Sequence, residues 1–210
     1  MRSKTDPRRS HARRSPALIT SPLEWQLQVA PVRPPALPVV AERGGTQLRA
    51  PKATVVVDTR EQNPFSFSRF RGWFAGVKHK ALQVGDYSVA GLEDVVTVER
   101  KDLPDLIHSF TTDRRVFVNR LRKMSDYPHR LLVVTAALSE VKSPYGGVSI
   151  DPNRITQSLI AALTGLGVPF VCAETHELGA EITASYLYQV HLYHWLETND
   201  YGRQLVDNDL

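Results

Sequence analysis

The sequence predicts a mixed α/β fold, in which helices flank a central sheet, and two stretches carry that prediction. The run Val95 to Val98, VVTV, consists of β-branched residues that favour a strand. Gly91 lies in a loop before it, so this run forms a hairpin with the short stretch after Gly85. The run Arg130 to Ala136, RLLVVTA, is almost continuously apolar, as expected of an interior parallel strand.

Apolar periodicity and capping residues predict the other elements. Phe65 to Lys80 is rich in aromatic residues and shows no regular pattern. We expect further strands at Ala53–Val57 and Val168–Cys172, and helices at Leu103–Phe110, Arg114–Met124, around Ile155–Leu166 and from Thr175 to about Glu197.

The chain divides by composition into an arm, a domain and a tail. Residues 1–50 hold nine basic residues against three acidic ones and half of the 14 prolines, which predicts a disordered arm. This arm either contacts DNA phosphates or is a leader without a role in binding. Residues 51–200 form one domain, and 201–210 form a C-terminal tail. The one cysteine, Cys172, fits a reducing cytoplasm, and no apolar run is long enough for a membrane span.

The predicted hairpin brings three charged side chains together. If its turn centres near Leu92 and Glu93, Asp86 lies directly across from Glu99. Because side chains alternate along a strand, Lys101 shares the face of Glu99. Such a group is either a solvated salt-bridge cluster or a site for a hard dication such as Mg²⁺ or Mn²⁺. With a lysine beside the ion, the second interpretation favours phosphodiester hydrolysis.

Three separated motifs occur in order along the chain. They are VVVDTRE at Val55–Glu61, GD at Gly85–Asp86, and ERK at Glu99–Lys101 with Asp105 after it. Together they resemble the nuclease domain of the XPF family, in the PD-(D/E)XK superfamily with a restriction-endonuclease-like fold. The resemblance covers about residues 53–197, and it implies a metal-dependent endonuclease acting on branched or otherwise irregular DNA.

The resemblance also implies roles for individual residues. Asp86 and Glu99 match the metal ligands and Lys101 the catalytic lysine, with Mg²⁺ or Mn²⁺ as cofactor. The positions that match others needed around the site are Asp58, Glu61, Arg100 and Asp105. Asp58, at a strand end, would bind the metal directly or through water.

Several basic residues are candidates for DNA contacts. Arg60 would bind a phosphate through two hydrogen bonds, or pair with Glu61 or Asp105. In the resembled family the helix that starts after Asp113 carries a basic residue near the site, which would be Arg114 or Arg115 here. The aromatic residues between Phe65 and Phe74 would stack on DNA bases or belong to the core.

The last helix and the length of the chain bear on partners. The segment from Ser185 to Leu196 is apolar almost all the way round, so it is a homodimer interface or a core helix. Only about 14 residues follow Leu196, too few for the helix-hairpin-helix module of larger family members. We therefore expect a separate DNA-recognition subunit or a simpler DNA cutter. A non-catalytic DNA-binding subunit is the alternative, and a small-molecule phosphohydrolase would need a glycine-rich phosphate loop, which the sequence lacks.

Overall fold

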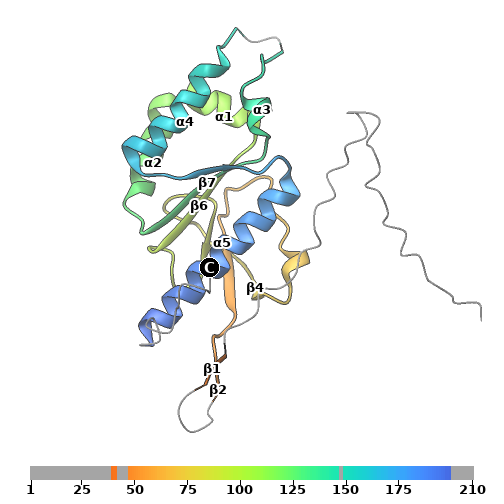
Figure 1. Ribbon diagram of the computed structural model, residues 1–210, viewed down its shortest axis with the longest axis vertical. Helices are drawn as coiled ribbons and strands as arrows, with labels where there is room; N and C mark the ends of the chain where they lie inside the picture. The colour runs from red at the N-terminus through yellow and green to blue at the C-terminus, as the bar shows by residue number, and fades with distance from the viewer. Residues whose placement is uncertain (1–38, 42–46, 147–148, 200–210) are drawn as a thin grey trace, which may run out of the picture. The chain divides into compact units, whose positions relative to one another are not determined.

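A six-stranded mixed sheet is the centre of the fold (Figure 1). The computed structural model describes residues 39–41, 47–146 and 149–199. The strand order is β4–β3–β5–β6–β7–β8. The strands are β3 (Ala53–Val57), β4 (Phe74–His79), β5 (Tyr87–Val89), β6 (Val96–Lys101), β7 (His129–Val134) and β8 (Phe170–Cys172).

The strand directions confirm the predicted mixed sheet. The hairpin strands β5 and β6 pair antiparallel, and β5 also pairs antiparallel with β3. On the other side of the hairpin, β6, β7 and β8 run parallel. The apolar β7 is therefore an interior strand, and its last four residues are buried. This places the hairpin near the middle of the sheet.

Helices cover both faces of the sheet. They are α1 (Leu103–Phe110), α2 (Arg114–Ser125), α3 (Leu138–Val141), α4 (Pro152–Leu166) and α5 (His176–Thr198). On one face, Leu132 and Val134 of β7 pack in a core with residues of α1, α2 and α4. The alternate residue Val133 points to the other face, which α5 covers. Close approach of α5 requires Gly179, because a Cβ atom there would lie 2.8 Å from the Phe65 ring.

The helix boundaries expected from the sequence hold because their caps are local. Asp102 accepts a hydrogen bond from the backbone N–H of Asp105 and starts α1. Thr175 does the same for Leu178 at the start of α5. Gly167 ends α4 with a left-handed conformation, φ 61°. None of the helices in the described residues is both long and apolar enough to cross a bilayer.

The aromatic segment between β3 and β5 differs from the prediction. It contains the short helix η2 (Ser68–Phe70) and the edge strand β4, where an irregular segment is expected. Only Phe74 of β4 is buried, so the strand has no alternating pattern to read. The five aromatic side chains are at most 7% exposed, and Phe65 stacks on Tyr87 at 5.0 Å between ring centroids. They are core residues, and the DNA-stacking interpretation is wrong.

The expected disorder of residues 1–50 is wrong for two short segments. β1 (Val39–Ala41) and β2 (Gln47–Arg49) pair antiparallel, with Val40 opposite Leu48. The two valines of β1 favour a strand, and β2, with the sequence QLR, pairs with it although it has only one apolar residue. The rest of the predicted arm, residues 1–38 and 42–46, and the predicted tail 201–210 lie outside the described residues.

Candidate active site

The β5–β6 hairpin sets the positions of the predicted site residues. Tyr87 pairs with Val98, so Asp86 lies opposite Glu99, and the Asp86 N–H donates to the Val98 carbonyl at 2.7 Å. Glu99 and Lys101 are paired with Leu132 and Val134, which face α1, α2 and α4. Both charged side chains therefore point to that side, and Arg100 points to the other. The register predicted from sequence is confirmed.

Gly85 allows the chain to enter the hairpin directly before Asp86. Its φ is +79°, a conformation that is unfavourable for residues with a Cβ atom. A Cβ atom there would also lie 2.1 Å from Thr97 Oγ1 and 2.9 Å from the Val98 carbonyl oxygen. Thr97 cannot move away freely, because its hydroxyl donates to the Val84 carbonyl at 2.9 Å. The glycine of the GD motif is therefore required by the backbone next to the site.

Replacing Gly85 by alanine is expected to lower the free energy of unfolding by about 3 kcal/mol or more, through strain and overlap together. Gly91 is the matched control, because it has φ +85° but a Cβ atom there would meet no described atom within 4 Å. Gly91→Ala should cost only the conformational strain, about 1 kcal/mol. Urea unfolding of both variants measures the difference, and equal losses would show that the close approach at Gly85 has no energetic effect.

Glu99 is the most buried charged residue of the described chain, with 0% of its surface exposed. Its Oε1 atom accepts from Lys101 Nζ at 2.7 Å and from Arg120 Nη1 at 2.7 Å. Its Oε2 atom is buried and has no hydrogen-bond partner among the described residues. A buried carboxylate oxygen without a partner is costly. Glu99 is thus bound by two cationic side chains through one oxygen, and its other oxygen is left without a partner in the described residues.

Asp86 lies beside this carboxylate in an unfavourable environment for a second negative charge. Its Oδ2 atom accepts from the Arg100 backbone N–H at 2.7 Å. Burial, and after it the negative charge of Glu99, raises the pKa of Asp86 to about 7. A cation between the two carboxylates would remove the repulsion that raises this pKa.

The sequence predicts that Asp58 contacts a metal, but its carboxylate is hydrogen-bonded to other groups of the protein. Its carboxylate accepts from Arg60 Nε, Arg60 Nη2, the Arg60 N–H and the Leu82 N–H, at 2.6 to 2.9 Å. Burial raises the pKa of Asp58, but these hydrogen bonds outweigh it and bring the pKa down to about 2. With both oxygens occupied, Asp58 fastens the segment that leads to Asp86. Its contact with a metal stays a prediction that this geometry does not favour.

Arg60 forms a different pair from the one named for it as an alternative, and Arg100 pairs with Glu61. Arg60 binds Asp58 and the Leu82 carbonyl, where Glu61 or Asp105 is expected. Arg100 is 6% exposed and donates from Nη2 to Glu61 Oε1 at 3.0 Å. Its Nε and Nη1 atoms are buried without a hydrogen-bond partner in the described part of the chain. The Arg100–Glu61 pair ties the loop after β3 to β6 at the cleft.

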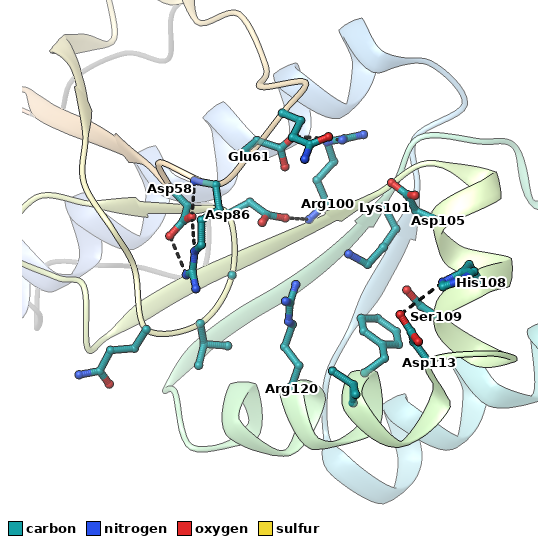
Figure 2. A pocket seen from close by; sticks show the side chains of 17 residues that line it. Asp58, Glu61, Asp86, Arg100, Lys101, Asp105, His108, Ser109, Asp113 and Arg120 are labelled. Atoms are coloured by element: carbon teal, nitrogen blue, oxygen red, sulfur yellow. Dashed lines mark hydrogen bonds and ion pairs between the residues drawn. The ribbon is translucent and has the colours of Figure 1, made fainter.

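A cleft of about 560 Å³ lies in front of these side chains (Figure 2). Lys101 lines it, with Nζ 5.4 Å from the centroid of the Phe117 ring. Asp105 lines the same cleft. Among the described side chains, Lys101 donates its hydrogen bond to Glu99 and not to Asp105. His108 and Asp113 form part of another wall, with His108 Nδ1 3.4 Å from Asp113 Oδ2. Other lining residues are Asp58, Arg60, Glu61, Gln83, Asp86, Arg100, Ser109 and Arg120.

Of the arginines on α2, Arg120 lines the cleft, whereas the sequence predicts Arg114 or Arg115 near the site. Arg114 donates to Ser158 on α4 at 2.9 Å, and Arg115 is exposed and does not line the cleft. Phe117 and Leu121 of α2 face the core, and Arg120 lies at the border of that stripe, on the side of Glu99. The position of Arg120 beside this apolar stripe could have marked it as a candidate. The sequence, however, does not show which side of the stripe faces β6.

The donor set fits a magnesium-like ion. Across the described ranges, no group of three or more Asp, Glu, His or Cys residues has an arrangement suited to a metal. Mg²⁺, however, is often bound by one or two carboxylates and several waters. The Oε2 atom of Glu99 and the carboxylate of Asp86, whose pKa is raised, supply that pair. The metal itself stays a prediction.

Comparison with known proteins identifies the family and the fold of this chain. Residues 57–186, more than half of the chain, match the ERCC4 domain. A structure of XPF from Aeropyrum pernix is similar in fold, with a TM-score of 0.51 and 22% identity over 65% of this chain and 64% of that chain. XPF from Aeropyrum pernix in complex with DNA has the same TM-score and identity over 66% and 64%. This chain therefore spans less than two thirds of the length of either structure. No curated protein matches the chain. The chain belongs to the ERCC4-domain family, and its mixed sheet flanked by helices is similar in fold to XPF from Aeropyrum pernix.

Proposed function

We propose that this protein is a Mg²⁺- or Mn²⁺-dependent endonuclease that hydrolyses phosphodiester bonds in branched or otherwise irregular DNA. The observation that carries the proposal is the pair of carboxylates, the half-buried Asp86 and the fully buried Glu99, with Lys101 2.7 Å from Glu99 at the edge of an open cleft. Membership of the ERCC4-domain family supports nuclease chemistry on DNA.

The residues divide the work as follows. Asp86 and Glu99 Oε2 would hold the ion, which supplies charge stabilisation at the phosphate and a more acidic bound water. Lys101 is 14% exposed, and its position over Phe117 keeps the ammonium group at the cleft. It can donate a hydrogen bond to the attacking water or to a phosphate oxygen. The Arg100 side chain pairs with Glu61, and its backbone N–H donates to Asp86 Oδ2. These two contacts hold β6 in place.

DNA would lie along the cleft and over the exposed basic residues beside it. Arg60 is 66% exposed although it binds Asp58, so its guanidinium edge is open to a phosphate. Arg114 and Arg115 at the start of α2 would contact the DNA backbone further from the reacting bond, and would add affinity without sequence preference. The Aeropyrum pernix XPF structure with DNA supports the proposed binding of DNA by this fold.

We also propose a partner at α5, either a second copy of the chain or a separate DNA-recognition subunit. The helix packs on its own sheet, with Leu187, Val190 and Leu196 buried. Tyr186, Tyr193 and His194 are half-buried aromatic side chains that a partner would cover. Light scattering should give twice the mass of one chain, and a single-chain mass would rule out the homodimer.

The function is tested with labelled flap, fork and Holliday-junction DNA beside a linear duplex. Wild-type protein should cut at least one branched substrate with Mg²⁺ or Mn²⁺, and should not cut with EDTA. Lys101→Ala should lose about a hundredfold or more in rate, because the charge next to the reacting phosphate is gone. Lys80→Ala is a suitable control, since Lys80 pairs with Glu93 away from the cleft. Equal cutting by wild type and Lys101→Ala would show that the active site is elsewhere, and binding without any cutting would favour a DNA-binding subunit.

A further inference from the structure

Arg120 is a charged cleft residue to which neither the motifs nor the proposed reaction assigns a task. It reaches from α2 to Glu99, and Figure 2 shows it projecting into the cleft toward Asp86 and Lys101. Its side chain is 44% exposed, unlike those of Glu99 and Lys101. It is therefore both bound to a candidate metal ligand and accessible to a substrate.

The arrangement of charge at Glu99 is unequal between the two oxygens. Lys101 and Arg120 both donate to Oε1, each at 2.7 Å, while the buried Oε2 accepts from none of the described residues. In the absence of a metal, the positive charges of both side chains lie beside this carboxylate. A dication bound by Glu99 and Asp86 would add two positive charges beside them, and like charges at such short range repel.

Arg120 is the cation that can move in response. Lys101 is on a central strand, is mostly buried and lies over the Phe117 ring. Arg120 is on a helix at the cleft border, with a long side chain and nearly half of its surface in solvent. A guanidinium group released into the cleft has the planar geometry to bind two oxygens of a phosphate.

We infer that Arg120 binds Glu99 in the place of a cation while the metal is absent, and that metal binding releases it to contact the phosphate at the reacting bond. The first half concerns this chain alone. The second half rests on the proposed function, because it requires a DNA phosphate in the cleft. Arg120 would then neutralise charge on the phosphate during attack.

The test uses the whole chain with Arg120→Gln, which removes the charge, and Arg120→Lys, which keeps it. Arg122→Gln is the control, because Arg122 is on the same helix but contacts Asn119 and does not line the cleft. Calorimetry with Mn²⁺ alone, without DNA, should show about three- to tenfold tighter binding to Arg120→Gln than to wild type, since a competing cation is gone. Arg120→Lys and Arg122→Gln should bind Mn²⁺ nearly as the wild type does.

The phosphate half is measured separately. At saturating Mn²⁺, single-turnover cutting by Arg120→Gln should be about a hundredfold slower than by wild type, although its metal affinity is higher. DNA affinity in Ca²⁺ should fall for the same variant and not for Arg122→Gln, whether or not any cutting occurs. Weaker Mn²⁺ binding to Arg120→Gln would overturn the exchange and leave Arg120 as a residue that orients Glu99. Unchanged cutting and unchanged DNA affinity would overturn the phosphate contact. If wild type itself does not cut, the proposed function fails, while the Mn²⁺ and Ca²⁺ titrations still decide the role of Arg120.

Discussion

Replacing Glu99 by glutamine is expected to reduce DNA cutting by about a thousandfold or more. The amide has the shape of the carboxylate but no negative charge, so it cannot attract a dication to the Oε2 position. It also leaves Lys101 and Arg120 without the charge that both contact at 2.7 Å. Single-turnover rates with saturating DNA and increasing Mg²⁺ measure the loss, and higher Mg²⁺ should not restore the rate.

Glu93→Gln is the control for this substitution. Glu93 is in the turn of the same hairpin and pairs with Lys80 at 2.8 Å, but it does not line the active-site cleft. Its replacement should leave the rate within about twofold of wild type, because surface pairs contribute little. Circular dichroism of both variants checks that the fold is intact. A Glu99→Gln protein that cuts within about tenfold of the wild type would exclude Glu99 from the reaction.

The metal-free protein is expected to become less stable as the pH rises, and Asp86 is the reason. Burial first, and then the charge of Glu99, raises the pKa of Asp86 from 3.8 to about 7. The folded state therefore keeps a proton that the unfolded chain loses near its ordinary pKa. Between these two pKa values, raising the pH favours the unfolded state, and above about pH 7 the full cost is present. That cost amounts to at most about 4 kcal/mol.

Urea unfolding at about pH 5 and about pH 8 in EDTA measures this effect. Asp86→Asn should remove most of the difference, because asparagine keeps the acceptor for the Arg100 N–H and has no proton to lose. Saturating Mg²⁺ should reverse the trend for the wild type, since the ion binds the deprotonated pair. If the free energy of unfolding of Asp86→Asn depends on pH as that of the wild type does, a group other than Asp86 causes the dependence.

The sequence predicts the centre of the site because its geometry is local. The glycine turn and the β-branched run define the hairpin, and its two-residue alternation places Asp86 opposite Glu99 with Lys101 on the same face. The caps of α1 and α5 are local as well. These features depend on neighbours within one or two elements, so no knowledge of the tertiary structure is needed.

The predictions that fail depend on contacts between distant segments. Arg120 reaches Glu99 across 21 residues, and which side of α2 faces β6 is decided only when the helix packs. Arg60 donates to the Leu82 carbonyl 22 residues away, and the Leu82 N–H donates to Asp58 over 24 residues, and no sequence pattern predicts these two contacts. The aromatic residues before β5 are core because α5 and Tyr87 cover them, as the Phe65 contacts show. Packing, and not residue type, settles such cases.

The central claim is that Asp86 and Glu99 share one divalent ion, and anomalous scattering from a crystal soaked in Mn²⁺ tests it most directly. We expect a single strong peak within about 2.5 Å of one carboxylate oxygen of Asp86 and of Glu99 Oε2. In the same crystal, Arg120 should have left Glu99 Oε1. The absence of any peak between these two carboxylates at saturating Mn²⁺, or a peak bound by neither of them, would contradict the account.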